Sequence, residues 1–323
     1  MAVITLVGPP ITSTLLHEIA VRLTAVRHDV EVLESETARS IRSDRLEQTE
    51  ILVVARAVCD RSVFRRTPRL RGIVSPLLGI EGIDIAAAAE HGVIVANGPM
   101  PSTSDSMAEA TFMLILATLY DLVGSIELMR KPAAAGNGRA KHMLFGKTVG
   151  ILGHGSIAQA LLQRLGPWGT RNLVHNRTVP DDVLADREFV EFEKILESSD
   201  ILVVLLALNR ETRHLLDAAA LNRMKPTAIL INTSRGGIIQ EDALPAWLAA
   251  HPDRRAALDV YEVEPLPGTS PLRSSGQATL TPHCVGHTSE SAAAMPIAAL
   301  KNIELILAGR APEPTVSGSL VFA

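Results

Sequence analysis

Three side chains in the second half of the chain have the chemistry of a site that binds an anion and moves a proton. Arg235, Glu264 and His283 each come after a short apolar run that is typical of a buried strand. A guanidinium can hold a carboxylate through two parallel hydrogen bonds, which an ammonium cannot do. A carboxylate behind an imidazole fixes the tautomer of the ring and raises its pKa, as a proton donor to a developing alkoxide requires. Each residue alone is more often structural, but their placement after successive strands favours a shared catalytic role.

A glycine-rich segment, Gly153–Ala158, follows the apolar run Val149–Leu152 and precedes a helical pattern. This is the GxGxxG/A pattern between a strand and a helix, where backbone amides approach the pyrophosphate of a dinucleotide. A glycine-rich turn without a ligand is the alternative interpretation. His154 lies between the first two glycines and is interpreted as an exposed spacer. The residues expected to contact the cofactor here are Gly153, Gly155, Ser156 and Ile157.

The end of the next predicted strand decides which nicotinamide cofactor is preferred. Folds that select NAD place an acidic residue about 20 residues after the glycines, where it accepts from the ribose 2′-hydroxyl. Here that position is Asn176, followed by Arg177 and Thr178, which can donate to a 2′-phosphate. Asp181 or Asp182 could instead supply an acidic partner. We therefore expect a preference for NADP(H), with NAD(H) possible.

Composition excludes several classes of function. The chain has 323 residues, a formal charge of -4 and 20% charged residues, without the extended basic face that nucleic acid selects. Its densest basic run, from Arg56 to Arg71, reads as a solvated face. Two cysteines without CxxC spacing indicate neither a disulfide framework nor a zinc site. We expect a cytoplasmic protein without a membrane segment or a metal.

Alternating apolar runs and amphipathic stretches predict an α/β protein with two doubly wound parallel sheets. The strands expected in the first sheet are Ile4–Val7, Val30–Leu33, Ile51–Val54, Gly72–Val74 and Val93–Val95. Those expected in the second are Thr148–Leu152, Leu173–His175, Ile201–Leu205, Ala228–Asn232, Ala256–Val260 and Ala278–Leu280. One helical stretch, Ser102 to about Met129, and a linker, Lys131–His142, lie between them. A last helix, Ser289–Ala308, has no strand of its own, so we expect it to return to the first domain.

Over nearly its whole length the chain resembles the D-isomer-specific 2-hydroxyacid dehydrogenases. Four stretches carry the resemblance: Gly146–Gly153 with the glycine pattern, Ile231–Gly237, Leu258–Pro265 and Thr281–Gly286. It implies a Rossmann nucleotide domain, residues 102–288, inserted into a flavodoxin-like substrate domain made of residues 1–101 and 289–323. It also implies a homodimer, with the helix that begins near Ser102 in its interface.

The same resemblance assigns roles to individual residues. Arg235 would bind the carboxylate of a 2-keto or 2-hydroxy acid and polarise the keto oxygen, with His283 as the general acid/base and Glu264 as its partner. The further residues assigned to the cofactor are Ala207, Thr212, Thr233 and Asp259, with Asp259 near the nicotinamide carboxamide. The residues assigned to the substrate carboxylate, besides Arg235, are Leu77, Leu78 and Gly79.

Two departures from the family pattern bear on substrate and cofactor. The substrate loop has Leu77 where the family has glycine, and Pro76 has no amide to donate, so the substrate is expected to carry an apolar side chain. The segment Leu205-Leu206-Ala207 stands where the family has His-x-Pro, which leaves the wall of the cofactor site without that proline. Two other functions stay open: a formate- or phosphite-type dehydrogenase on the same scaffold, and a non-catalytic dinucleotide sensor like the corepressors that share the fold.

Overall fold

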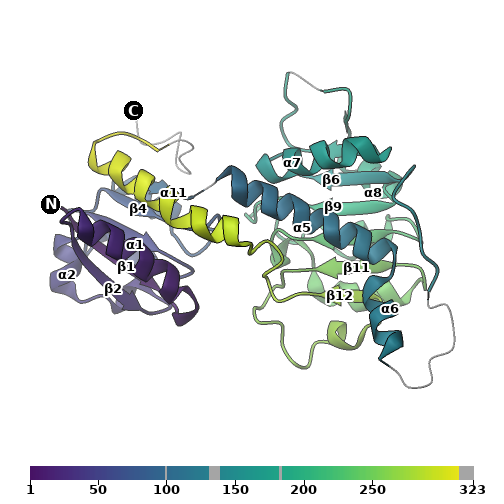
Figure 1. Ribbon diagram of the computed structural model, residues 1–323, viewed down its shortest axis with the longest axis horizontal. Coiled ribbons are helices and arrows are strands. Elements are labelled where there is room, and N and C mark those ends of the chain that lie inside the picture. The colour runs from purple at the N-terminus through teal and green to yellow at the C-terminus, as the bar shows by residue number, and fades with distance from the viewer. Residues whose placement is uncertain (99, 131–138, 182–183, 313–323) are drawn as a thin grey trace. The chain divides into compact units, whose positions relative to one another are not determined.

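The computed structural model describes residues 1–98, 100–130, 139–181 and 184–312. The chain forms two compact units, each with its own parallel sheet (Figure 1). Unit 1 consists of Met1–Thr103 and Ser289–Ala323, and unit 2 consists of Ser104–Thr288. The predicted fold class, two doubly wound parallel-sheet domains, is confirmed.

Unit 1 contains a five-stranded sheet in the order β2-β1-β3-β4-β5, with parallel pairing throughout. Its strands are β1 (Val3–Gly8), β2 (Asp29–Glu34), β3 (Ile51–Val54), β4 (Gly72–Val74) and β5 (Ile94–Ala96). The helices are α1 (Ser13–Ala25), α2 (Ser43–Gln48), α3 (Arg61–Phe64), α4 (Ile85–Glu90) and α11 (Ser289–Leu307). This strand order is that of the flavodoxin-like fold. The last helix returns to the first sheet, as expected.

The strands of unit 1 are buried on both faces because helices cover both. In β3, Ile51 and Val53 belong to the cluster that contains α1 and α11, whereas Leu52 and Val54 belong to the cluster that contains α2, α3 and α4. Since side chains alternate between the two faces of a strand, an apolar run without polar interruption is what a doubly covered strand needs.

Unit 2 contains a seven-stranded parallel sheet in the order β12-β11-β10-β9-β6-β7-β8. Its strands are β6 (Thr148–Leu152), β7 (Arg171–His175), β8 (Glu188–Phe189), β9 (Ile201–Val204), β10 (Ile229–Asn232), β11 (Arg255–Leu258) and β12 (Ala278–Leu280). The sequence pattern did not predict β8. The helices α5 (Pro101–Leu119) and α7 (Ser156–Leu165) cover one face. The opposite face is covered by α8 (Phe192–Ser198), α9 (Ala218–Asn222) and α10 (Leu244–Ala249).

The single helix expected from Ser102 to Met129 is wrong in one respect. The stretch forms two helices, α5 and α6 (Leu122–Met129), with a bend of 59° between them. The break falls at Asp121, which adopts a left-handed conformation with φ of 46°. A residue in that region cannot continue a right-handed helix. Residues 131–138 of the predicted linker lie outside the described residues.

Candidate active site

The glycine turn of unit 2 lies where the strand order of its sheet reverses, between β6 and β9. Gly153 adopts φ of +103°, and a Cβ there would lie 2.5 Å from the carbonyl oxygen of Leu205. Its amide donates to the carbonyl of His175, at 2.8 Å. Glycine is therefore required both by the backbone conformation and by the close approach of the neighbouring strand end. Open parallel sheets bind ligands at this kind of reversal.

The residues after this turn fit the diphosphate of a dinucleotide. Gly155 immediately precedes α7, is exposed, and has no heavy atom within 4 Å of the position a Cβ would take. The amides of Ser156 and Ile157 belong to the first helical turn, where no intrahelical acceptor is available. These amides and the positive end of the helix dipole favour an anion over Gly155. The hydroxyl of Ser156 also accepts a hydrogen bond from Ser104, at 2.9 Å.

His154 is half-buried rather than an exposed spacer. Its Nε2 lies 3.0 Å from Nη1 of Arg187, and its ring packs against Phe189 in a T-shaped contact with centroids 5.1 Å apart. Burial, and secondarily the charge of Arg187, lower the pKa of His154. The sequence interpretation failed because Arg187 is 33 residues away and nothing in the local pattern pairs the two.

The residues after β7 that were expected to choose the cofactor form a surface turn. The side-chain amide of Asn176 donates to the carbonyl of Thr178 at 2.7 Å. Arg177 pairs with Glu211 at 2.9 Å, and the two side chains are 84% and 72% exposed. An ion pair this exposed contributes about 0–1 kcal/mol, so a phosphate can displace Glu211 at little cost. Asp181 is exposed, and Asp182 lies outside the described residues.

Three further residues assigned to the cofactor occupy different environments. Thr212 donates to the carbonyl of Ala207 at 2.7 Å and accepts from the amide of Asn209 at 2.8 Å, which closes the turn after β9. Thr233 is 5% exposed, and its hydroxyl shares a hydrogen bond with that of Thr111 in α5, at 2.8 Å. Ala207 is exposed in the turn after β9, whereas the hydroxyl of Thr233 faces α5.

Arg235 follows β10 in a turn that its neighbours shape. The buried side chain of Asn232 donates to the carbonyl of Arg235 at 3.0 Å and accepts from both the amide and the hydroxyl of Ser234. A Cβ on Gly236 would lie 1.9 Å from the carbonyl carbon of Tyr261. Only glycine lets this turn pack directly against the loop that follows β11, which carries Glu264.

The structure brings Glu264 and His283 together. Oε2 of Glu264 lies 2.7 Å from Nδ1 of His283, and the other oxygen accepts from the amide of Tyr261 at 3.1 Å. Both side chains are about one third exposed, 33% and 31%. Because an ionised carboxylate can only accept, Nδ1 carries the proton in this pair. Nε2 is therefore the ring atom available for proton exchange.

Asp259 fixes the loop that presents His283. It is 1% exposed, and its Oδ1 accepts from the hydroxyl of Thr281 at 2.7 Å and from the amide of Cys284 at 3.0 Å. His283 itself adopts a left-handed conformation, with φ of 52°. Such a conformation in a residue with a side chain persists only where its surroundings hold it. Sequence reasoning assigned Asp259 to the cofactor and missed this anchoring role.

A second carboxylate–imidazole pair near the same edge was also missed. Nε2 of His214 lies 2.9 Å from Oε1 of Glu262. Glu262 and Glu241 each accept from the other's backbone amide, at 3.0 and 2.9 Å. Burial, and secondarily the charges of Glu262 and Glu264, raise the pKa of Glu241. These contacts connect the three loops that carry His214, Glu241 and Glu262. The spacing of these residues in the sequence does not reveal that they meet.

The loop of unit 1 that was assigned to the substrate carboxylate is closed by its own serine. The hydroxyl of Ser75 donates to the carbonyls of Leu77 and Gly79 and accepts from the amide of Leu77 at 3.2 Å. The amides of Leu78 and Gly79 make no hydrogen bond with any residue that the structure describes. Two of the three predicted residues therefore have an amide available for an anion.

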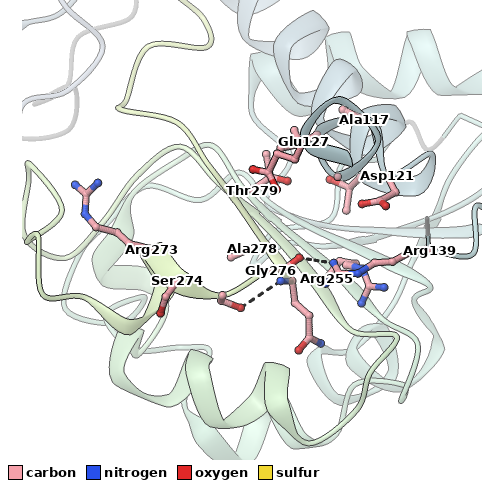
Figure 2. A pocket seen from close by; sticks show the side chains of 15 residues that line it. Ala117, Asp121, Glu127, Arg139, Arg255, Arg273, Ser274, Gly276, Ala278 and Thr279 are labelled. Carbon is pink, nitrogen blue, oxygen red and sulfur yellow. Dashed lines mark hydrogen bonds between the residues drawn. The ribbon is translucent and has the colours of Figure 1, made fainter. Parts of the chain in front are cut away.

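A pocket of about 200 Å³ lies at the other end of the unit 2 strands, at the amino ends of β11 and β12 beside α6 (Figure 2). Arg139 and Arg255 contribute positive charge to it, and Asp121 and Glu127 contribute negative charge, whereas the side chain of Arg273, which also lines it, points away. Arg235, Glu264 and His283 follow the carboxyl ends of their strands, so this pocket is separate from them. Among the described residues no group of three His, Cys, Asp or Glu could hold a metal ion.

Within the described ranges no single helix is long and apolar enough to cross a membrane. The bent pair of α5 and α6 passes the test when its helices are combined, by length and composition only.

Comparison with known proteins identifies the family. Residues 112–285 match the family model of the D-isomer specific 2-hydroxyacid dehydrogenase NAD-binding domain. The glyoxylate reductase of Pyrococcus horikoshii is 31% identical, over 94% of each chain. The crystal structure of a glyoxylate reductase from Paecilomyes thermophila has a TM-score of 0.86 and 25% identity, over 98% of each chain.

A third relative is named for its cofactor. The NADPH-dependent glyoxylate/hydroxypyruvate reductase of Sinorhizobium meliloti, solved with citrate, has a TM-score of 0.84 and 25% identity, over 98% of this chain and 99% of that one. The chain therefore belongs to the D-isomer specific 2-hydroxyacid dehydrogenase family, NAD(P)-dependent oxidoreductases that transfer a hydride between the cofactor and a 2-keto or 2-hydroxy acid.

Proposed function

We propose that this protein reduces 2-keto acids with NADPH, over a range from glyoxylate to acids with a short apolar side chain. The observation that carries the proposal is the hydrogen bond between Glu264 and His283, which leaves one imidazole nitrogen for proton transfer. Relatives named glyoxylate reductases support the small end of the substrate range. The apolar residues Leu77 and Leu78 in the unit 1 loop support an apolar group on C2.

In the proposed reaction each side chain acts at a stated atom. Arg235 holds the substrate carboxylate and stabilises the negative charge that grows on the keto oxygen. His283 delivers the proton from Nε2 to that oxygen, while Glu264 keeps the ring oriented and stabilises its charged form. The free amides of Leu78 and Gly79 are the proposed donors to the substrate carboxylate in unit 1. The cofactor, when bound at the glycine turn, supplies the hydride that C2 accepts.

The preference for NADPH rests on the residues after β7. Asn176 cannot repel a 2′-phosphate as a carboxylate would. Arg177 lies in a surface turn, where its ion pair with Glu211 is exposed and weak. A 2′-phosphate carries more negative charge than the Glu211 carboxylate, so a charge-assisted hydrogen bond from Arg177 to it replaces a weak exposed pair at little cost. The NADPH-dependent relative from Sinorhizobium meliloti is consistent with the same choice.

A panel experiment tests the proposal. We would measure kcat/KM for glyoxylate, pyruvate and 2-keto acids with longer apolar side chains, each with NADPH and with NADH. We expect turnover with at least one acid and higher kcat/KM with NADPH, and a smaller NADPH preference in Arg177→Ala. A wild type that prefers NADH, or an Arg177→Ala variant that keeps its preference, would show that the cofactor assignment is wrong.

The same panel separates the two other functions. Oxidation of formate or phosphite without reduction of any keto acid would favour the smaller-anion dehydrogenase. One formate dehydrogenase, from Staphylococcus aureus, has a TM-score of 0.83 but only 24% identity, so its likeness concerns the fold. Cofactor binding without any turnover would favour a dinucleotide sensor.

We also propose that the protein is a homodimer assembled through unit 2. Large apolar side chains are exposed on and beside α5 and α6: Met113, Tyr120, Leu122, Val123, Ile126, Met129, Met143, Phe145 and Trp168. Apolar surface of this extent is typical of an interface. Sedimentation of the wild type should give twice the chain mass, and Phe145→Asp, which places a charge at a side chain 71% exposed, should shift the species toward monomer.

The cytoplasm is the proposed location. Cys59 is buried, and burial with the charges of Asp60 and Asp84 raises the pKa of its thiol to about 12. Cys284 is exposed next to His283. A reducing compartment keeps that thiol from being oxidised beside the proposed proton donor. If activity survives prolonged exposure to an oxidant, the protein does not depend on a reducing compartment to protect Cys284.

A further inference from the structure

Arg187 has an unusual environment for an arginine. Its side chain is only 5% exposed, although it follows a surface segment. Nε and Nη2 donate to the two carboxylate oxygens of Asp186, at 2.7 and 3.0 Å, and Nη1 lies 3.0 Å from Nε2 of His154. The two ends of the planar guanidinium are thus engaged by different partners, which fixes the position of Nη1.

This contact determines the tautomer of His154. A guanidinium can only donate, so Nε2 of His154 must accept and cannot carry a proton. Nδ1 then carries the proton of the neutral ring. Nδ1 makes no hydrogen bond with any residue that the structure describes. His154 therefore presents a fixed donor for which none of the described residues is an acceptor.

The charges around His154 keep its ring neutral. Arg187 and Asp186 are the ionised groups that act on it, while Phe189 packs on the ring and Gln159 reaches only its carbonyl oxygen, at 3.4 Å. Burial, followed by the charge of Arg187, lowers the pKa of His154, and Asp186 offsets this in part. A proton on Nε2 would break the hydrogen bond and place two cations in contact. At pH 7 the ring is thus a neutral donor.

The backbone places this donor between two parts of the cofactor site. His154 separates Gly153 from Gly155, over which the diphosphate fits. The Gly153 amide is hydrogen bonded to the carbonyl of His175, whose next residue is Asn176, the position that meets the ribose 2′-substituent. A side chain that starts between the diphosphate turn and the end of β7 would lie beside an adenosine ribose bound there.

We propose that Nδ1 of His154, held as a donor by Arg187, binds the 2′-phosphate of NADPH. The proposal rests on the proposed function in its choice of cofactor, and it adds a second determinant beside Arg177. The two differ in kind: Arg177 is exposed and exchanges partners, whereas His154 is held in one orientation before the cofactor arrives. A donor ordered in advance loses less conformational entropy on binding.

Binding measurements without substrate test the proposal. Dissociation constants of NADPH and NADH would be measured by calorimetry for the wild type, His154→Leu and Phe189→Leu. His154→Leu keeps an apolar side chain against Phe189 and removes the donor, so NADPH should bind about 10- to 100-fold more weakly and NADH less than twofold more weakly. Phe189→Leu disturbs the same packing and keeps the donor, and should change the ratio of the two constants less than twofold.

Magnetic resonance of labelled protein reports the tautomer of His154 separately from cofactor binding. In protein labelled with ¹⁵N histidine, the resonances lost in His154→Leu should be those of a neutral ring protonated at Nδ1. In Arg187→Met they should move toward the usual mixture of tautomers, and the preference for NADPH should fall with them. A ring protonated at Nε2 in the wild type would overturn the proposal.

Three binding outcomes are distinguishable. Equal weakening of NADPH and NADH in His154→Leu would assign His154 to the diphosphate and overturn the 2′-phosphate contact. A wild type that prefers NADPH with an unchanged ratio in His154→Leu would overturn the proposal and leave Arg177 as the determinant. A wild type that prefers NADH would instead contradict the proposed function, whatever the variant does.

Discussion

Two clusters in unit 2 contain the same three kinds of side chain in opposite arrangements. In one cluster, Glu264 accepts a hydrogen bond from Nδ1 of His283, and Arg235 lies in the neighbouring turn after β10. In the other, Asp186 accepts from Arg187, which in turn donates to Nε2 of His154. An imidazole backed by an acceptor can become a cation, whereas one backed by a permanent donor stays neutral. The partner, rather than the histidine, decides whether the ring can transfer a proton or only bind.

The largest effect expected from this comparison is on turnover at His283. His283→Ala removes the proton donor, and positioned acid catalysis contributes roughly 100- to 10,000-fold. We expect kcat to fall by that factor while the dissociation constant of NADPH changes less than twofold. His154→Leu is the matched control and should show the reverse pattern. Similar losses of kcat in both variants would remove the distinction between the clusters.

The two arginines provide a second test. Arg235→Lys keeps a charge but loses the bidentate geometry, so KM for the keto acid should rise about tenfold or more and kcat should fall, with cofactor binding unchanged. Arg187→Lys should instead weaken NADPH binding and leave KM for the keto acid unaltered. Steady-state kinetics and calorimetry on both variants check this. Normal keto-acid kinetics in Arg235→Lys would mean that Arg235 does not hold the carboxylate.

The pH profile of the reduction rate tests the role of Glu264, the acceptor in the first cluster. Glu264→Gln keeps the shape of the side chain and removes the negative charge that stabilises an imidazolium. The fall of the reduction rate with rising pH should therefore move to lower pH, while the rate at the acidic plateau changes less than in His283→Ala. A midpoint identical to that of the wild type would contradict the pairing inferred from the 2.7 Å contact.

The smallest effect concerns stability and the second cluster. Because the folded pKa of His154 is lowered, the unfolded chain takes up its proton first as the pH falls. Its contribution is present above about pH 6.5, the ordinary value, and is lost as the pH falls through the lower folded pKa. The stability of the wild type relative to His154→Leu should therefore decline from pH 7 to pH 5. If the urea midpoints of the wild type and of His154→Leu keep the same ratio from pH 7 to pH 5, the protonation of His154 is not linked to stability.

The sequence was sufficient to predict the fold because buried strands are encoded locally. Apolar runs such as Ile51–Val54 specify buried strands, and the order of strands places whatever follows each strand at one edge. Arg235, Glu264 and His283 were candidates because each lies in the loop after a strand of one sheet, and their catalytic roles stay a prediction. The pairing of Glu264 with His283 was expected and the structure has it at 2.7 Å.

Features that depend on contacts between distant segments could not be predicted. His154 was interpreted as a spacer because Arg187 reaches it only through the fold. The break at Asp121 was missed because one residue in a left-handed conformation leaves the apolar pattern of α5 and α6 intact. The strand β8 has only two residues, too few for a period-two pattern. Asp259 was assigned one partner, whereas three groups of a later loop converge on it.

The return of α11 to unit 1 has a consequence for synthesis on the ribosome. Residues Ala299, Ile303 and Ile306 of α11 complete the same apolar cluster as β1, β3 and α1, and Ile306 packs directly over Gly72 of β4. All of unit 2, residues 104–288, is translated before that helix. At about 5–20 residues per second, the part of this face that α11 covers, beside α1, stays exposed for roughly 10 to 40 s. Nascent chains of this protein should therefore bind chaperones at unit 1 and be released when α11 emerges.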